Sequence, residues 1–316
     1  MKIVIFKNPY EYCDFMCDSI KNKKDVELIE PIVLNKNNAR NIFLYILFHI
    51  NQKLFYKCLV RFSLNKSLSN EEKICFISFD SSEWTGTREF IDELKTKYPN
   101  SKTAIIIYNS IQNNFEKVKQ YEERFDYCFT FDPFDSKTYG WHYFQGLMPL
   151  ECSVNKNNKK KYDICFIGND KGRYKELKEL YCYLTEAGFK CIFHITSNIL
   201  KKDPIDEKII YENALPFKET LELEMKSKCI LDVTCVSGKK QGISLRILEA
   251  IFCNSKVISN NEYTQDIPAI KKGTFLFSDK PEITSLRQFI DDESRYIERS
   301  ELNIGFDSIF DVINTA

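Results

Sequence analysis

The turn that follows the apolar run at 162–167 combines glycines with basic side chains. It reads GNDKGR, with Gly168 at its start, and a helical pattern begins directly after it. Glycine lets a backbone approach a ligand closely, and a helix N-terminus presents free N–H groups and a positive dipole end. Lys171 and Arg173 add full positive charge, so this turn is suited to a diphosphate. The alternative is an ordinary strand-to-helix turn with solvated charges.

A second segment, which begins at Ser237, leads from an apolar strand pattern through a basic loop into a helix. Its sequence is SGKKQGISLRILEA. The residues at the expected helix start and in the loop before it, where an anion would meet backbone donors and positive charge, are Lys239, Gly242 and Ser244. Arg246 and Glu249 are three residues apart, so they share one helix face near that start. A surface ion pair between these two side chains is the alternative interpretation.

Strand-like and helix-like segments alternate along the chain, which is typical of α/β proteins with parallel sheets. In the first half the expected strands are 2–6, 73–79, 102–107 and 127–131, and the expected helices are 40–62, 85–98 and 111–122. In the second half the expected strands are 162–167, 190–195, 208–211, 229–233, 255–259 and 274–277, and the expected helices are 172–187, 217–228 and 243–253. Both basic turns therefore follow strands, at the sheet edge where this architecture binds its ligands.

A polar, basic stretch at 153–161 is the best linker candidate, because it has no apolar period. It divides the 316 residues into two parts of about the usual domain size, ~150 residues. We expect an α/β fold of two Rossmann-like domains, 1–150 and 160–316, with a cleft between the carboxyl ends of their strands. The helical tail from 282 onward is a candidate to cross back to the first domain.

Composition narrows the class of protein. Lys+Arg and Asp+Glu are equal at 45 each, which argues against a bulk nucleic-acid binder. The 12 cysteines include no CxxC pair, and several lie in apolar runs, so they predict buried free thiols in a reducing compartment.

The N-terminus lacks the layout of a signal peptide. The most apolar run, at 42–50, is far shorter than the ~20 residues of a membrane span. We therefore expect a cytoplasmic protein, either soluble or at the inner face of the membrane.

The second segment and the strand after it resemble the donor-binding region of GT-B glycosyltransferases. The helix GISLRILEAIF at 242–252 is followed by KVISNN at 256–261. This looks like a subgroup found in bacterial capsule and lipopolysaccharide gene clusters, in which a G-x-[ST]-L-R-x-x-E-A-x-F helix leads into a strand ending in paired asparagines. The strand YDICFIG at 162–168 fits the same pattern. The resemblance covers about 160–262 well, and the first half only by architecture.

The resemblance implies a donor site for a nucleotide sugar in the second domain. Many retaining GT-B members carry two glutamates separated by seven residues, and here Gln241 has the first position and Glu249 the second. The second glutamate typically binds the ribose hydroxyls, a role that carries over to Glu249. The glutamine leaves retaining and inverting transfer open. GT-B enzymes neutralise the leaving diphosphate with basic side chains and a helix N-terminus, and the chain has no D-x-D motif. No metal or other cofactor is therefore expected.

The first domain is expected to bind the acceptor, which would be a surface polysaccharide, a lipopolysaccharide or a related glycan, free or lipid-linked. If transfer inverts configuration, a carboxylate or a histidine must take the proton of the acceptor hydroxyl. Asp80 and Glu83 follow the strand at 73–79 and are preferred to His142, which lies in the aromatic stretch YGWHY. The acidic loop could instead cap a helix, and the aromatic stretch could be a crossover that packs between domains.

Other interpretations remain open at this stage. The segment 42–62 is apolar, aromatic and basic, and it predicts either a core helix or a surface that contacts a membrane peripherally. A sugar-nucleotide epimerase of the same fold is an alternative to a glycosyltransferase. A non-catalytic nucleotide-binding relic, in which Gln241 has replaced a functional glutamate, is a third. A dehydrogenase fits least, because neither turn carries the dinucleotide-binding glycine pattern.

Overall fold

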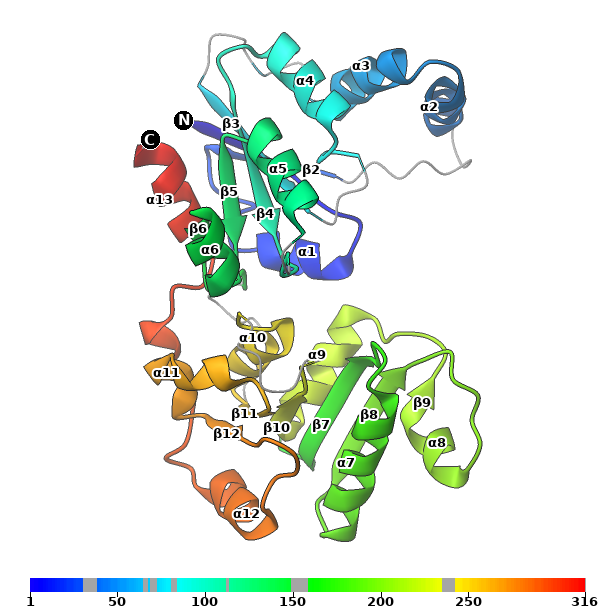
Figure 1. Cartoon of the computed structure of the whole chain (residues 1–316), viewed down its shortest axis with the longest axis vertical. Helices are drawn as coiled ribbons and strands as arrows, with labels where there is room; N and C mark the ends of the chain where they lie inside the picture. The colour runs from blue at the N-terminus through cyan, green and yellow to red at the C-terminus, as the bar shows by residue number, and fades with distance from the viewer. Residues whose placement is uncertain are drawn as a thin grey trace. The chain divides into compact units, whose positions relative to one another are not determined.

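The structure is a computed structural model that describes residues 1–30, 39–64, 68, 73–80, 84–111, 114–148, 159–234 and 242–315. The chain divides into two compact units, of which the first is Met1–Leu150 with Ile304–Ala316 and the second is Glu151–Asn303. Each unit contains one six-stranded sheet whose paired strands are parallel, with helices on its faces (Figure 1). The predicted α/β class with two Rossmann-like domains is confirmed.

The first unit has the strand order β2-β1-β3-β4-β5-β6. Its elements are β1 (Lys2–Phe6), α1 (Glu11–Cys17), β2 (Val26–Ile29), α2 (Ala39–Ile50), α3 (Gln52–Ser63), β3 (Ile74–Phe79), α4 (Arg88–Lys97), β4 (Lys102–Ile107), α5 (Phe115–Arg124), β5 (Tyr127–Thr130), α6 (Pro133–Tyr139), β6 (His142–Tyr143) and α13 (Asp307–Thr315). The last of these, α13, lies beside the segment after α1, where Lys23 pairs with Asp307. The end of the described chain therefore belongs to the first unit.

The second unit has the strand order β12-β11-β10-β7-β8-β9. Its elements are β7 (Tyr162–Asn169), α7 (Tyr174–Glu186), β8 (Cys191–Thr196), α8 (Pro204–Ile209), β9 (Ile210–Tyr211), α9 (Phe217–Met225), β10 (Ser227–Asp232), α10 (Leu245–Phe252), β11 (Lys256–Ser259), the 3-10 helix η1 (Glu262–Gln265), α11 (Pro268–Lys271), β12 (Thr274–Leu276), α12 (Ile283–Asp291) and the 3-10 helix η2 (Arg299–Glu301). One face of the sheet packs with α7 and α12. The crossovers through α9 and α10 run in the other direction along the sheet, which places them on its opposite face.

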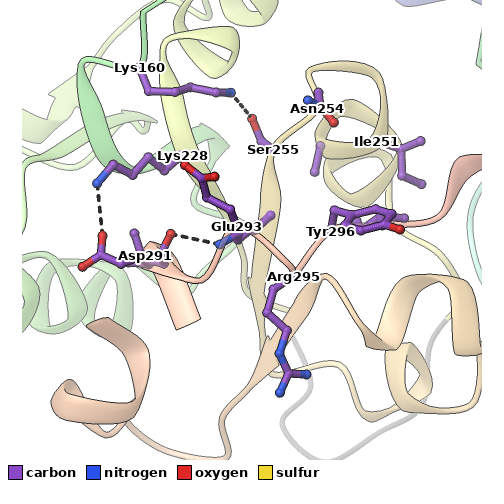
Figure 2. A pocket seen from close by; sticks show the side chains of 13 residues that line it. Lys160, Lys228, Ile251, Asn254, Ser255, Asp291, Glu293, Arg295 and Tyr296 are labelled. Carbon is purple, nitrogen blue, oxygen red and sulfur yellow. Dashed lines mark hydrogen bonds and ion pairs between the residues drawn. The ribbon is translucent and has the colours of Figure 1, made fainter. Parts of the chain in front are cut away.

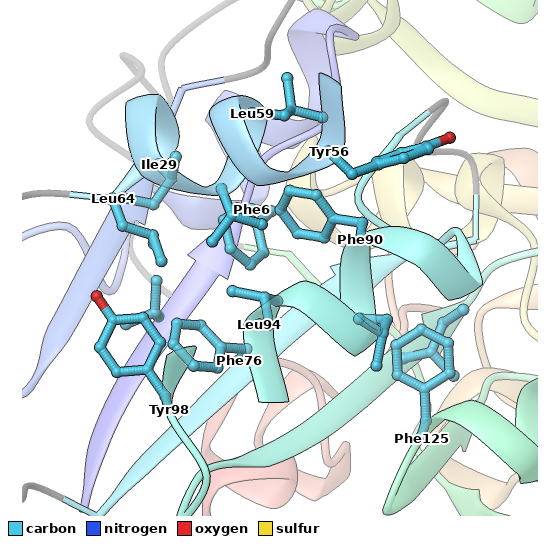
Figure 3. Packing of buried hydrophobic residues seen from close by; sticks show 14 of the residues in the cluster. Phe6, Ile29, Tyr56, Leu59, Leu64, Phe76, Phe90, Leu94, Tyr98 and Phe125 are labelled. Atoms are coloured by element: carbon cyan, nitrogen blue, oxygen red, sulfur yellow. The ribbon is translucent and has the colours of Figure 1, made fainter. Parts of the chain in front are cut away.

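Aromatic side chains fill the core of the first unit between the sheet and the helices α3 and α4 (Figure 3). Side chains of a strand alternate between faces, so Val4 and Phe6 face this layer. The Phe6 ring meets Phe90 of α4 edge to face, with centroids 5.2 Å apart. Such contacts add specificity to the apolar burial that holds a helix on a sheet. The core thereby fixes β1 and β3, and with them the residues that follow the carboxyl ends of these strands.

The single helix expected over 40–62 is wrong, because two helices occupy that segment. Asn51 separates them with extended backbone angles, and its side chain accepts a hydrogen bond from Leu54 N at 3.0 Å. Asparagine is among the best helix N-caps, so it begins a new helix even inside an apolar run. Short elements that periodicity did not predict also appear, among them α1, β2, α6, β6, α8 and α11.

We predict that Phe90→Ala lowers the free energy of unfolding of the first unit by about 3–5 kcal/mol, the usual cost of a large cavity in a packed core. Phe90 is fully buried. The matched control is Phe115→Ala at the start of α5, because that ring is 69% exposed and should change stability by less than about 0.5 kcal/mol. Denaturant unfolding followed by circular dichroism measures both variants, and equal losses would contradict the described packing.

Candidate functional site

The sheet of the second unit reverses its direction of growth between β7 and β10. From β7 the chain adds β8 and β9 on one side, and it then returns to add β10, β11 and β12 on the other. Open parallel sheets bind ligands at such a switch point, outside the carboxyl ends of the strands. In this unit the switch point is where Gly168, near the end of β7, lies against the side chain of Arg246 from the first turn of α10.

Arg246 of α10 lies across Gly168 at this switch point. Gly168 has φ of +147°, and a Cβ at this position would lie 2.2 Å from Arg246 Nη2. Arg246 Nε donates a hydrogen bond to the carbonyl oxygen of Ile167 at 3.2 Å. Its guanidinium also stacks over the Phe166 ring, 4.6 Å from the centroid. The structure thus brings together the two segments that the sequence marked separately, and only glycine leaves room for the contact.

The start of α10 is fixed by a carboxylate that sequence reasoning missed. Asp232, at the end of β10, is buried, and its two oxygens accept hydrogen bonds from the Ser244 and Ser259 hydroxyls, each at 2.9 Å. The Ser244 oxygen in turn caps α10 by accepting from Ile247 N at 3.3 Å. The signal for this role was an acidic residue that closes an otherwise apolar strand. Ser244 therefore positions the helix start beside the switch point.

The paired asparagines after β11 hold the two described ends of the segment between β10 and α10. Asn260 Oδ1 accepts a hydrogen bond from Thr234 N at 2.7 Å, which ties it to the chain just after β10. Asn261 Nδ2 donates to the carbonyl oxygen of Gly242 at 3.3 Å. Both asparagines are buried, so their role here is to support the loop ends that lead into α10.

The turn at 168–173 contains one exposed cation and one buried one. Arg173 is only 8% exposed, and it donates to the carbonyl oxygens of Asp170 and Asn169 at 3.2 and 3.3 Å. Its guanidinium therefore stabilises the turn from within. Lys171 is exposed, with φ of +45°, and its backbone N–H donates to Asn169 Oδ1 at 2.8 Å. Of the two cations predicted for this turn, Lys171 is the one with its side chain in solvent.

Glu249 lies inside the unit beside a second acid, Glu224 of α9. Burial is the main cause that raises the pKa of Glu249 to about 7, against an ordinary value of 4.5. Burial raises the pKa of Glu224 well above its usual range, and a hydrogen bond to Glu249 and the charge of Glu249 raise it further. Glu224 Oε1 is buried without a hydrogen-bond partner among the described residues, and a proton shared between the two carboxyls would remove the repulsion of two buried like charges. The predicted ribose contact of Glu249 stays a prediction, and its 5% exposure places this carboxyl away from solvent.

Asp80 and His142, the two candidate bases that the structure describes in the first unit, do not come together. Asp80 follows β3 and accepts hydrogen bonds from Tyr108 N and Asn109 Nδ2, both at 3.2 Å, while burial raises its pKa. His142 is exposed on β6, in register with Phe129 of β5. Three strand spacings separate β3 from β6, which is about 14 Å. Glu83, like Lys239 and Gln241 in the second unit, lies outside the described residues.

A cavity of about 450 Å³ lies at the opposite end of the second sheet, where the strands begin (Figure 2). It is lined by residues at the starts of β10 and β11 and by Lys160, just before β7. Lys160 Nζ donates to Ser227 O and Ser255 Oγ, both at 2.9 Å. Because ligands of parallel sheets bind at the carboxyl ends, this cavity is not the candidate site. Across the described ranges, no group of three or more His, Cys, Asp or Glu side chains is arranged to hold a metal ion.

Neither protein-family models nor curated protein sequences match the chain. Among solved structures, AviGT4, a glycosyltransferase involved in avilamycin A biosynthesis, is similar with a TM-score of 0.60 and 10% identity over 100% of this chain and 96% of that one. UDP-GlcNAc 2-epimerase from Neisseria meningitidis has a TM-score of 0.53 and 13% identity over 100% and 99%. The N-terminal domain of trehalose-6-phosphate phosphatase from Candida albicans has a TM-score of 0.51 and 11% identity over 98% and 92%. Identities this low show the fold alone, which is of the GT-B type.

We predict that Glu224→Gln reduces the pH dependence of stability. Between pH 4.5 and about pH 7 the unfolded chain releases protons that the folded carboxyl pair keeps, so the free energy of unfolding falls as pH rises through this window. The glutamine amide can donate to the Glu249 carboxylate without a bound proton. Chemical unfolding at pH 5 and pH 8 should therefore show a smaller fall than in the wild type.

The matched control for this prediction is Glu222→Gln, because Glu222 is exposed on the same helix. This variant should keep the wild-type fall in stability between the two pH values. An equal fall in the wild type and in Glu224→Gln would show that the two buried carboxyls do not share a proton.

Proposed function

We propose that the chain is a glycosyltransferase that uses a nucleotide sugar as donor, and that its second unit binds the donor. The observation that carries the proposal is the contact of Arg246 with Gly168 at the switch point of the second sheet. It puts a guanidinium, the glycine that the guanidinium covers and the start of a capped helix at one place. These are the groups that bind a diphosphate. The GT-B fold supports the assignment without identifying the sugar.

Transfer of the sugar requires the leaving diphosphate to be stabilised, because negative charge grows on it as the glycosidic bond breaks. Arg246 supplies a planar charge with several donors, and Lys171 supplies a second cation from the turn after β7. The first turn of α10 adds backbone N–H groups that have no partner within the helix. Lys239 would add a further cation, and Gln241 would contact the sugar. The ribose contact proposed for Glu249 requires its carboxyl to turn away from Glu224 when the donor binds, because the side chain is buried in this structure. In this scheme the residues of the chain perform the charge stabilisation.

We propose that the first unit binds the acceptor, a surface polysaccharide, a lipopolysaccharide or a related glycan. Asp80 is the preferred base, because burial raises its pKa and so makes its carboxylate a better proton acceptor. Tyr108 N and Asn109 Nδ2 hold that carboxylate at the end of β3. His142, on the strand three places along the sheet from β3, is the alternative base.

A sugar-nucleotide epimerase is the second candidate, favoured by the similarity to the epimerase structure. The two activities differ in their need for an acceptor. An epimerase converts the sugar nucleotide alone, whereas a glycosyltransferase releases the nucleoside diphosphate in proportion to glycan formed. Incubation with a panel of sugar nucleotides, with and without acceptor glycans, separates them by the products. Binding across the panel without turnover would support the third possibility, a non-catalytic relic.

We predict that Arg246→Ala weakens binding of the donor nucleotide about 10- to 100-fold, since a hydrogen bond to a charged group contributes ~1.5–3 kcal/mol. Lys171→Ala should weaken donor binding less than Arg246→Ala does. Because the Lys171 side chain is exposed, its loss should not disturb folding, so weaker binding in this variant would report the lost charge. Arg295→Ala, an exposed arginine beside the cavity at the other end of the sheet, is the control. Isothermal calorimetry measures all three, and unchanged affinity in Arg246→Ala and Lys171→Ala would refute the donor site.

We predict that Asp80→Asn lowers kcat about 100-fold or more, the usual contribution of a general base, and leaves donor affinity unchanged. The amide oxygen can still accept from Tyr108 N, so the fold is preserved. Steady-state kinetics with a saturating donor tests this expectation. A loss of turnover in His142→Ala with full activity in Asp80→Asn would assign the base to His142 instead.

A further inference from the structure

The helix α2 exposes large apolar side chains on the surface of the first unit. Leu44 and Leu47 are buried, whereas Ile42, Ile46 and Ile50 are exposed, the last of them to 77%. These three lie four residues apart and form one stripe along the helix. Phe43 is exposed beside the stripe. Figure 1 shows α2 on the side of α3 that faces away from the sheet of this unit. We call Ile42, Phe43, Ile46 and Ile50 together the α2 stripe.

The charged side chains of α2 and α3 are all positive. Residues 39–64 contain four Lys or Arg side chains and no Asp or Glu, although the whole chain has zero net charge. On α3, Lys53, Lys57 and Arg61 are all exposed, and their spacing of four residues aligns them along one face. Leu54 is exposed among them. An apolar stripe therefore lies on one helix and a basic stripe on the next.

The dimensions suit an interfacial position. At 1.5 Å per residue the 12 residues of α2 extend about 18 Å, which is well short of a bilayer core of ~30 Å. Over the parts of the chain that the structure describes, no helix combines the length and apolar character that a membrane span needs. A helix of this length with an apolar face can instead lie in the plane of the headgroups.

We propose that α2 and α3 form a docking surface for an anionic lipid membrane, with the α2 stripe inserted among the acyl chains and Lys53, Lys57 and Arg61 against the headgroups. Apolar burial and attraction to anionic lipid act together in such binding. The charge favours lipid over a second copy of this chain, because two identical basic faces repel each other. This inference goes beyond the proposed transfer reaction and does not depend on it.

The test uses the full chain with vesicles of phosphatidylcholine alone or mixed with phosphatidylglycerol. We expect the protein to sediment with the mixed vesicles only, and to release from them as the salt concentration rises, because salt screens the attraction. Equal sedimentation with both vesicle types, or none with either, would overturn the proposal.

Two pairs of variants locate the contact on the protein. Ile50→Asp should reduce binding to mixed vesicles at least about tenfold, whereas Leu200→Asp should not, although Leu200 is exposed to the same extent, 79%. Lys53→Glu should reduce binding about fivefold or more, since one basic side chain near an anionic surface contributes ~1 kcal/mol, and Lys119→Glu on α5 should not. Equal losses within either pair would overturn the assignment to α2 and α3.

Sedimentation velocity without vesicles tests the alternative that the α2 stripe contacts a second copy of this chain. We expect the wild type and Ile50→Asp to have the same mass over a range of protein concentrations. A concentration-dependent dimer that Ile50→Asp abolishes would assign the α2 stripe to contact with a second copy, and would overturn the membrane proposal.

Discussion

The site in the second unit depends on one buried carboxylate, that of Asp232. A carboxylate without partners is costly to bury, and here two serine hydroxyls satisfy it. One hydroxyl belongs to the start of α10 and the other to the end of β11, so a single side chain joins two strand ends and a helix. With the helix start held in this way, Arg246 reaches Gly168 from the first turn of α10. The charge that stabilises the framework is thus separate from the charges available to a ligand.

The same unit contains polar groups of two kinds. Arg173 and Glu224 are buried and engaged with neighbours of the fold, so their contribution is to geometry. Lys171 is exposed at a turn that glycines shape. Residue type alone does not separate these kinds, because arginine in a basic turn can hold carbonyl oxygens as readily as phosphate oxygens. Burial and partners make the distinction.

The sequence was sufficient to predict most of the long alternating elements, the two sheets and the segments that follow β7 and β10. Apolar runs such as those of β3 and β8 are unambiguous when both faces of a parallel strand are covered. The contact between Arg246 and Ile167 was not predictable, because 79 residues separate them and only the strand order places them side by side. Glu224 was missed for a related reason. It lies in α9, a helix rich in acidic residues, and such a sequence predicts a solvent-exposed face. Only the packing of α9 against α10 in the structure shows that Glu224 is buried.

The break at Asn51 illustrates a limit of periodicity. The apolar pattern continues across it, and a single polar cap decides that one helix ends and another begins. The resulting change in direction is what gives α2 its own exposed face, distinct from that of α3. Local hydrogen bonding of one side chain has therefore determined how much apolar surface this unit shows to its surroundings.

The return of α13 to the first unit has a consequence for the order of synthesis. Ribosomes produce the chain from its N-terminus, and domains tend to fold as their residues emerge. Residues 304–315 complete the first unit, yet they emerge only after every residue of the second. Synthesis of the first unit therefore starts before that of the second but ends after it. Until α13 has been made, the surface that it covers in the folded unit stays exposed.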